Sequence, residues 1–400
     1  MELTGDRSPQ PTRAAAFNSV IPLLIAIAHA VHDSYSAFFP ALLPLLIEKF
    51  SLTNTLAGSL NLFYTLPSLA QPLIGYLSDK HNLKWVIILA PAVTAICMTL
   101  LGVMPHIAWV ILLLVIAGTS SSSLHVIGPA MSSRFSGARL GRGMSFWMVG
   151  GEAGYSLGPI VLVSILGLFN LSCLPIFSLL GVGMSLYLWG RMKNETTRNT
   201  DNTDPNSNML DKRLLRAVLI PGMVLGAARA MMHVSLTTFL PTFLISEGAT
   251  IWFSGAAFSI AGGAGVLGAL VAGSLSDRFG RKPFLLFSLT LTPLFMQLFL
   301  HVKETWLQVA LLVCIGFFGF SIMPVLMAMI LEQFPNNRSF VNGIYMGTTF
   351  LTMALAGVLV GRLADLYSLR FTFGMSAWVL LLGIPFVFLI PGRKEKMAGD

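Results

Sequence analysis

One short pattern occurs twice in this chain, and the two copies lie about 200 residues apart. Residues 75–84 read Gly-Tyr-Leu-Ser-Asp-Lys-His-Asn-Leu-Lys, and residues 273–282 read Gly-Ser-Leu-Ser-Asp-Arg-Phe-Gly-Arg-Lys. Upstream, residues 32–40 are echoed in the same way by residues 233–241, and each of these segments runs from a histidine to a proline. The chain is therefore a duplicated unit, and two related halves around a central site are typical of membrane transporters.

The composition indicates a membrane protein rather than a soluble one. Charged residues make up 10% of the chain and hydrophobic residues 55%, with a mean hydropathy of +0.77, whereas soluble chains carry about 25% charged residues. Most of the long apolar stretches exceed the roughly 20 residues that a helix needs to cross a bilayer. We expect an all-α membrane protein with twelve transmembrane helices in two pseudo-symmetric six-helix halves. The predicted spans are 18–47, 54–77, 85–104, 107–133, 143–168, 173–190, 214–245, 251–275, 283–301, 305–331, 340–367 and 371–391.

Basic residues predict the orientation. Most of the 25 Lys and Arg residues fall on the side that the two termini share, whereas Lys49, Lys303, Arg362 and Arg370 fall on the other side. Because cytoplasmic loops are enriched in Lys and Arg, we expect a multi-pass protein of the cell (inner) membrane with both termini in the cytoplasm. The net charge of +8 is then a topology signal, and we expect no nucleic-acid partner.

The polar segments divide the chain into five parts. Residues 1–17 form a predicted cytoplasmic tail, 18–191 the first six-helix half, 192–213 a cytoplasmic linker, 214–391 the second half, and 392–400 a second tail. The linker is almost free of apolar residues, as flexible connections are. We expect a monomer that works within the lipid bilayer on a small-molecule substrate.

Three ionisable residues lie inside predicted spans, where charge is costly and usually functional. They are Asp33 in the first span, Glu152 in the fifth and Arg229 in the seventh. Two carboxylates and one guanidinium on separate spans indicate a central polar site, in which Asp33 or Glu152 carries an exchangeable proton and Arg229 binds substrate. The alternative is a static structural ion pair between Arg229 and one carboxylate.

Helical spacing groups further polar residues with these three. The first span carries a polar face, the seventh repeats its spacing, and the fifth adds a third; all three are expected to face one cavity. His125 in the fourth span joins the predicted substrate site, unless it only forms a hydrogen bond between two helices. The three faces contain His29, His32, Asp33 and Ser36; Arg229, Met232, His233 and Leu236; and Met148, Glu152, Tyr155 and Pro159.

A metal site and an enzyme are the less favoured alternatives. Histidines with a carboxylate suit a divalent metal, but the region has no Cys or Met cluster and Arg229 would repel a cation. The three cysteines show no disulfide or metal spacing. The chain also lacks a nucleophile–base pair or a hydrolase motif. We therefore expect no enzyme activity, no cofactor and no resident metal.

The two repeated loops predict a conformational latch. Asp79 with Lys80, and Asp277 with Arg278 and Arg281, lie at predicted cytoplasmic helix ends. A carboxylate there can face the N-terminus of a neighbouring helix in one conformation and leave it in the other. The alternative is that these basic loops only fix the topology. A third fragment, residues 361–365, reads Gly-Arg-Leu-Ala-Asp and is interpreted as a remnant of the repeat.

These features together resemble the major facilitator superfamily. The resemblance rests on twelve spans, a central linker and the loop Gly-x-x-x-Asp-Arg-x-Gly-Arg-Lys, which residues 273–282 match throughout and residues 75–84 match in part. Gly154, Gly158 and Pro159 resemble the Gly-x-x-x-Gly-Pro motif of its proton-coupled exporters. Residues 118–125, Gly-Thr-Ser-Ser-Ser-Ser-Leu-His, resemble its fosmidomycin-resistance branch.

The resemblance implies proton-coupled export of a small organic molecule or drug by alternating access, in the manner of an antiporter. In this interpretation the glycine motif shapes the fifth span where the halves meet. Two other functions stay open, namely proton-coupled uptake of a small anionic metabolite and, less favoured, transport of a divalent metal.

Overall fold

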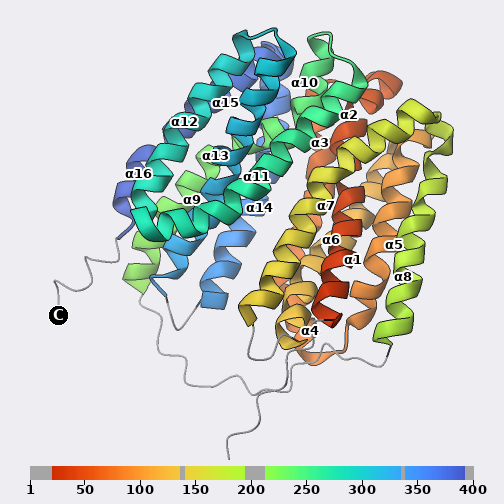
Figure 1. Ribbon diagram of the computed structural model, residues 1–400, viewed down its shortest axis with the longest axis horizontal. Helices are drawn as coiled ribbons and strands as arrows, with labels where there is room; N and C mark the ends of the chain where they lie inside the picture. The colour runs from red at the N-terminus through yellow and green to blue at the C-terminus, as the bar shows by residue number, and fades with distance from the viewer. Residues whose placement is uncertain (1–19, 136–139, 194–211, 335–337, 392–400) are drawn as a thin grey trace, which may run out of the picture.

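The computed structural model describes residues 20–135, 140–193, 212–334 and 338–391. Within these ranges the chain is helical and contains no β-strand. Two helical bundles lie side by side, the first half at the right of Figure 1 and the second half at the left. The predicted all-α fold is confirmed.

The helices of the first half follow one another across the bundle. The second predicted span is bent, because Pro67 and Pro72 begin new helical segments at η1 and α4. The elements are α1 (Val20–Ser36), α2 (Phe38–Phe50), α3 (Asn54–Thr65), η1 (Leu66–Ala70), α4 (Gln71–Lys80), α5 (Lys84–Leu100), η2 (Leu101–Val103), α6 (Ile107–Phe135), α7 (Leu140–Leu168), η4 (Leu171–Phe177) and α8 (Ser178–Met192).

The second half repeats this order. Its first span contains a π-helical turn, η5, directly before Pro241, at the place where the first half breaks between α1 and α2 before Pro40. The elements are α9 (Lys212–Val234), η5 (Ser235–Phe239), α10 (Leu240–Ser246), α11 (Ile251–Phe279), α12 (Arg281–His301), α13 (Thr305–Leu331), α14 (Arg338–Leu366), α15 (Leu369–Leu381) and α16 (Ile384–Leu389).

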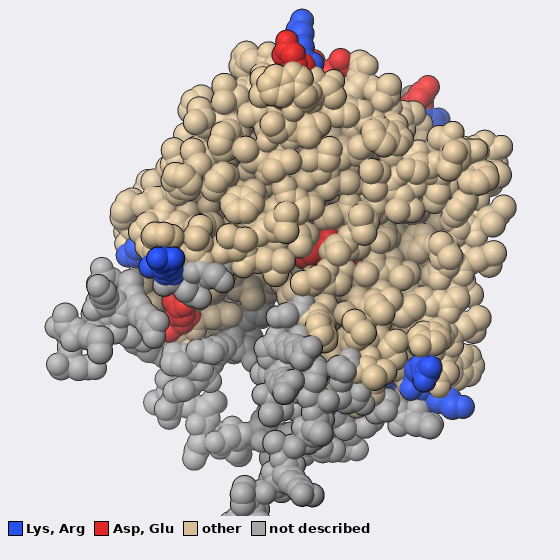
Figure 2. Space-filling model, viewed as in Figure 1, with Lys and Arg blue, Asp and Glu red and all other residues tan. Residues whose placement is uncertain are grey.

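The apolar surface of the bundle fits a bilayer. Eleven helical stretches in the described ranges are long and apolar enough to cross a membrane. The predicted span 54–77 is helical too but more polar, since it contains Asn54, Asn61 and Gln71. Figure 2 shows charged side chains at the two ends of the molecule and, between them, a broad band that is uncharged except for a small acidic patch near its centre. Leucines such as Leu179, Leu180 and Leu267 are exposed on the helices, as lipid-facing residues are.

The two halves meet at the end remote from the termini. There α3 packs on α14, so closely that a Cβ atom on Gly58 would lie 2.0 Å from the Gly357 carbonyl oxygen. A second interface is formed by α7 and α11, where the Ile160 amide donates to Ser259 Oγ at 3.1 Å. These contacts join the halves at the end remote from the start of α1 and the end of α16 (Figure 1). We call it the outer end, because the predicted topology places it away from the cytoplasm.

Candidate functional site

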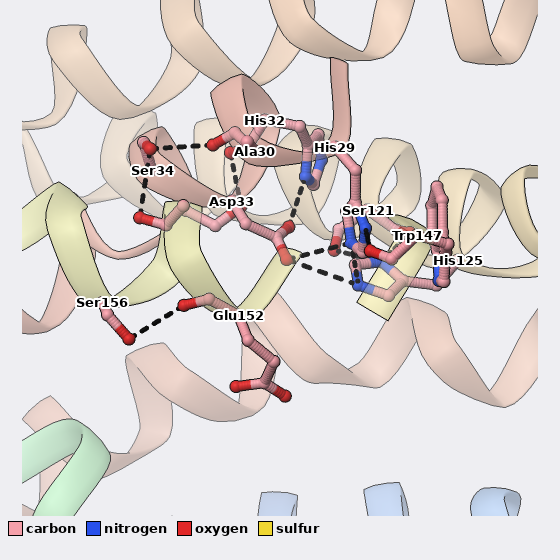
Figure 3. A network of polar contacts seen from close by, with 12 residues as sticks. His29, Ala30, His32, Asp33, Ser34, Ser121, His125, Trp147, Glu152 and Ser156 are labelled. Atoms are coloured by element: carbon pink, nitrogen blue, oxygen red, sulfur yellow. Dashed lines mark hydrogen bonds and ion pairs between the residues drawn. The ribbon is translucent and has the colours of Figure 1, made fainter. Parts of the chain in front are cut away.

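Asp33 is the centre of a buried polar cluster in the first half (Figure 3). Its Oδ1 accepts a hydrogen bond from His32 Nδ1 at 2.8 Å. Its Oδ2 lies 3.0 Å from His29 Nε2 and 3.8 Å from His125 Nε2. His29, His32 and Asp33 come from α1 and His125 from α6, so the structure brings together four predicted site residues from two helices. We call these four residues the histidine cluster.

Backbone carbonyl groups fix the orientation of two rings in the histidine cluster. His29 Nδ1 donates to the Trp147 carbonyl oxygen at 3.0 Å, and the two rings stack with centroids 3.6 Å apart. His125 Nδ1 donates to the Ser121 carbonyl oxygen at 2.8 Å, one turn back on the same helix. As a consequence the two Nε2 atoms point toward each other, 3.2 Å apart.

A row of glycines on α7 allows α1 to approach closely enough to form the cluster. A Cβ atom on Gly154 would lie 2.1 Å from the Ala30 carbonyl oxygen, and one on Gly151 would lie 2.2 Å from His29 Cε1. Gly158 makes the same kind of contact with α1. Gly154 and Gly158 therefore face α1 of their own half, whereas Pro159 lies beside α11 of the other half, near Gly255.

Glu152 projects away from the histidine cluster, as Figure 3 shows. Its side chain is exposed, and its carboxylate has no hydrogen bond or ion pair with any described residue. It interacts electrostatically with His29 and Asp33 of its own half and with Arg229 of the other half. Glu152 therefore lies within electrostatic range of polar groups of both halves, and its side chain is exposed.

Arg229 lies in the second half and has one hydrogen-bond partner among the described residues. It lies on α9, is buried, and its Nη2 is 3.3 Å from His233 Nδ1. Its Nε is buried without a partner. Met232 and Leu236 line the same small void of about 10 Å³ as Arg229 and His233, so the predicted face exists. Arg229 forms no ion pair with a described carboxylate, and the alternative of a static pair is not found.

The remaining predicted site residues, Ser36, His32 and Tyr155, are occupied by contacts with other residues or packed in the interior. Ser36 Oγ donates to the His32 carbonyl oxygen at 3.1 Å, and the His32 ring is fully buried with no partner for Nε2. The Tyr155 ring packs on Phe258 of α11, with centroids 5.6 Å apart. Tyr155 therefore lies where the two halves meet, while Ser36 and His32 belong to the interior of the first half.

The sequence of the chain matches a known protein family. The sequence profile of the Major Facilitator Superfamily matches residues 24–275 and 254–399. The chain belongs to this superfamily. It is a transporter and not an enzyme, as the sequence predicted.

Relatives within the superfamily include resistance proteins. The chain is 25% identical to the fosmidomycin resistance protein of Escherichia coli (strain K12), over 97% of this chain and 98% of that protein. It is also 34% identical to the multidrug resistance protein MdtG of Serratia proteamaculans (strain 568), over 42% of each chain.

Solved structures of other transporters share the fold. The nucleoside transporter NupG superposes with a TM-score of 0.74 at 16% identity, over 93% of this chain and 100% of that one. A bacterial homologue of the human lysosomal transporter Spinster, in an inward-facing and unoccupied conformation, gives a TM-score of 0.70 at 12% identity. It covers 94% of this chain and 96% of that one. These likenesses establish the major facilitator fold alone.

The superfamily loops are described in part. The side chains of Asp79, Lys80 and Asp277 lie outside the described residues, so the predicted latch stays a prediction. Arg278 lies over the Phe279 ring. Arg281 donates through Nη1 to Ser276 Oγ at 2.6 Å and through Nη2 to Glu332 Oε1 at 2.9 Å. Arg281, at the start of α12, thus contacts the ends of α11 and α13. No sequence pattern predicted Glu332 as its partner.

A further contact of this superfamily member was missed from the sequence. The Asp365 carboxylate, at the end of α14, accepts hydrogen bonds at 2.7 Å from the backbone amides of Asn54 and Thr55. These amides form the N-terminus of α3 in the other half, where negative charge is favoured. The fragment 361–365 is therefore more than a trace of the repeat, because it makes the aspartate-to-helix contact at the outer end of the molecule.

Proposed function

We propose that this transporter exports a small organic molecule in exchange for protons, by alternating access across the cell (inner) membrane with both termini in the cytoplasm. The observation that carries the proposal is Glu152, an accessible carboxylate that interacts with polar groups of both halves. The resistance proteins among the relatives support export as the direction. The working unit is proposed to be a monomer.

Exchange follows if the proton and the substrate use the same carboxylate. A substrate with a cationic or hydrogen-bond-donating group can bind the charged form of Glu152, and a proton on that carboxylate removes the attraction. Only one of the two can then be held at a time, which is the condition for antiport. Asp33 suits this role less well, because both of its oxygens already face histidine nitrogens.

The closed outer end defines the step of the cycle in which substrate enters. With α3 on α14 and α7 on α11, the halves are joined remote from the termini, and the substrate is proposed to enter from the cytoplasm. Rocking of the halves about the central site would then open the outer end. Asp365 would hold the closed outer end, and the loops at Asp79 and Asp277 would act at the cytoplasmic end.

Proton-coupled uptake of an anionic metabolite is the second candidate, and Arg229 is the observation that favours it. Its guanidinium is buried, has one hydrogen bond to His233 and has an unpartnered Nε. An anionic substrate would satisfy these donors. Charged Glu152 would compete with that anion for Arg229, so a proton on Glu152 would promote anion binding. The same two residues would then give symport instead of antiport.

The sign of the response to a pH gradient separates the two candidates. Purified protein is reconstituted in vesicles and supplied with labelled fosmidomycin as the first probe, followed by a panel of cationic, neutral and anionic drugs. Under antiport, vesicles that are acidic inside accumulate the probe. Under symport, vesicles that are acidic outside accumulate it. Accumulation that ignores the gradient in both arrangements contradicts proton coupling.

A further inference from the structure

Three atoms of the histidine cluster converge on one point (Figure 3). They are Nε2 of His29, Nε2 of His125 and Oδ2 of Asp33. The two nitrogens are 3.2 Å apart, and the carboxylate oxygen lies 3.0 and 3.8 Å from them. All three side chains belong to the first half, on α1 and α6.

Each of these three atoms presents a lone pair to the others. A carbonyl oxygen can only accept, so the contacts of His29 with Trp147 and of His125 with Ser121 place the ring hydrogen on Nδ1. In the neutral imidazole the other nitrogen, Nε2, then carries a lone pair. Two such nitrogens and a carboxylate oxygen repel one another unless a cation lies between them.

The spacing of the three atoms has the size of a metal site. A point equidistant from them lies about 2 Å from each, which is the usual length of Zn–N and Zn–O bonds. We propose that His29, Asp33 and His125 bind a divalent transition metal ion such as Zn²⁺, with water as a fourth ligand. Two histidines and one carboxylate are a set that holds such ions in other proteins.

A second layer of contacts orients every ligand. The Trp147 and Ser121 carbonyl oxygens hold the two imidazoles from behind, and His32 donates to Asp33 Oδ1, the oxygen that faces away from the metal. Metal-binding histidines generally donate their other ring hydrogen to a carbonyl or carboxylate, and ligating carboxylates are themselves hydrogen-bonded. A cluster needed only for packing between helices would not require all three groups to be aimed in this way.

Access and charge are compatible with a cation. The His125 side chain is 35% exposed and the Asp33 side chain 11%, so an ion can enter past His125. The repulsion expected from Arg229 is weakened, because Arg229 lies in the other half and Glu152 interacts with both Arg229 and His29. Since all three ligands belong to one half, the ion would move with that half. The site therefore does not depend on which substrate is transported, or in which direction.

Metal binding by the purified full chain tests the site directly. Protein without a histidine tag is treated with a chelator and dialysed against Zn²⁺, and bound metal is measured by mass spectrometry. We expect one Zn²⁺ per chain. Co²⁺ in the same site should give the strong visible absorption of a tetrahedral complex, and Zn²⁺ should raise the apparent melting temperature, because a ligand of the native state stabilises it.

Variants assign the ion to these residues. Loss of an outer partner of a metal ligand typically costs about 10–100-fold in affinity, so loss of a ligand should cost at least that much. His125→Ala removes a partly exposed ring, and Asp33→Asn keeps the shape of the side chain; both should lose Zn²⁺ and the Co²⁺ absorption. His233→Ala, in the other half, is the matched control and should bind like the unmodified protein.

Two results would overturn the proposal. If the unmodified protein binds no stoichiometric Zn²⁺ or Co²⁺, the cation shared by the three atoms is a proton. If His125→Ala and Asp33→Asn bind Zn²⁺ as tightly as His233→Ala, the ion lies elsewhere. Neither result bears on export, which the vesicle experiment tests separately.

Discussion

The two halves of the duplicated chain carry opposite charges near equivalent positions of the repeat, His32 and His233. In the first half, Asp33 follows His32, and both carboxylate oxygens face histidine nitrogens of the same half. In the second half, the equivalent His233 contacts Arg229, whose Nε is buried without a partner. One half therefore holds a negative charge that is surrounded by nitrogens, and the other holds a positive charge that is incompletely paired.

This difference indicates which half contains a buried polar group that another molecule could satisfy. A buried polar group without a partner costs about 1–3 kcal/mol, and more if it is charged. The histidine cluster avoids most of that cost within its own half, because the ring Nδ1 atoms of His29, His125 and His32 have partners there and the proposed cation would lie between the remaining lone pairs. Arg229 does not, so a partner from outside its half is favoured, and the substrate or Glu152 can supply it. From this asymmetry we propose a structural and cation-binding role for the first half and a substrate-binding role for the second.

Substitution of Glu152 is the strongest test of this comparison, because Glu152 interacts with the histidine cluster and with Arg229. Glu152→Gln keeps the size of the side chain but cannot exchange a proton. We expect gradient-driven accumulation in vesicles to be lost, so that the substrate reaches the same concentration inside and outside, because a carrier that exchanges no proton cannot use the pH gradient. Downhill exchange of labelled substrate should persist, because it needs no net proton movement.

A second carboxylate controls for the loss of charge as such. Glu304 is an exposed residue directly before α13, at the outer end of the molecule. The variant Glu304→Gln should leave accumulation unchanged. If Glu152→Gln retains gradient-driven accumulation at the level of Glu304→Gln, Glu152 does not carry the proton, and the two halves communicate by another route.

Stability measurements sharpen the comparison between the halves. Asp33→Asn removes the charge that accepts the hydrogen bond from His32 Nδ1 and that the proposed cation would neutralise, and hydrogen bonds to charged groups contribute about 1.5–3 kcal/mol. Arg229→Met removes a buried charge that has one partner, and replacing such a charge by an apolar group is often neutral or stabilising. We expect the apparent melting temperature in detergent to fall clearly for Asp33→Asn and to change little for Arg229→Met.

The opposite ranking would contradict the assignment of roles. Both variants are measured at one scan rate, because membrane proteins of this size often unfold irreversibly. If Arg229→Met is the less stable variant, the contact between Arg229 and His233 holds the fold together and Arg229 is not free for a substrate.

The fold was largely predictable from the sequence, because hydropathy and duplication act over the whole chain. The predicted span 305–331 and α13 coincide, and the span 251–275 lies within α11. The polar residues of the site were predictable for the same reason, since a charge inside a span is rare. Their pairing was not. His125 lies 96 positions from His29, and no periodic pattern indicates which face of α6 meets α1.

Small residues determine how closely the helices approach one another, which hydropathy does not predict. Gly151 and Gly154 determine how closely α7 approaches α1, and so where His29 lies. The motif at Gly154 and Gly158 resembled a feature of the interface between the halves, but both glycines face α1. Asp365 was missed for a similar reason, because its partners are the backbone amides of Asn54 and Thr55. Backbone groups carry no sequence signal.

Adding one methyl group tests whether close packing maintains the cluster. In Gly151→Ala the new Cβ atom would lie 2.2 Å from His29 Cε1, so α1 and α7 must separate or the ring must move. Overpacking of this kind costs about 1–3 kcal/mol, and we expect a modest fall in the apparent melting temperature. Gly167→Ala, on the same helix with nothing within 4 Å, is the control. Equal stability of the two variants would show that the histidine cluster does not depend on this approach.

The smallest expected effect concerns the contact that holds the halves together at the outer end. Asp365→Asn removes the charge at the N-terminus of α3 but leaves one oxygen to accept a hydrogen bond. A charge at a helix terminus contributes about 0.3–1 kcal/mol, so the population with an open outer end should rise about two- to fivefold. Ala364, near the end of α14, is buried in this structure. Labelling of Ala364→Cys by a membrane-impermeant maleimide, in a background where Cys97, Cys173 and Cys314 are serine, therefore measures this population.

The matched control for the outer contact is again Glu304→Gln, which removes a carboxylate from the same outer end without touching α3. Faster labelling in Asp365→Asn alone would mean that a contact between the halves, and not the charge at that end, keeps the outer end closed. Equal labelling in both variants would contradict this. A bond worth about 1 kcal/mol is strong enough to bias the resting state and weak enough to break in each cycle. The contact between Asp365 and α3 therefore suits a latch, whereas the more fully paired histidine cluster suits a part of the molecule that stays assembled while the halves move.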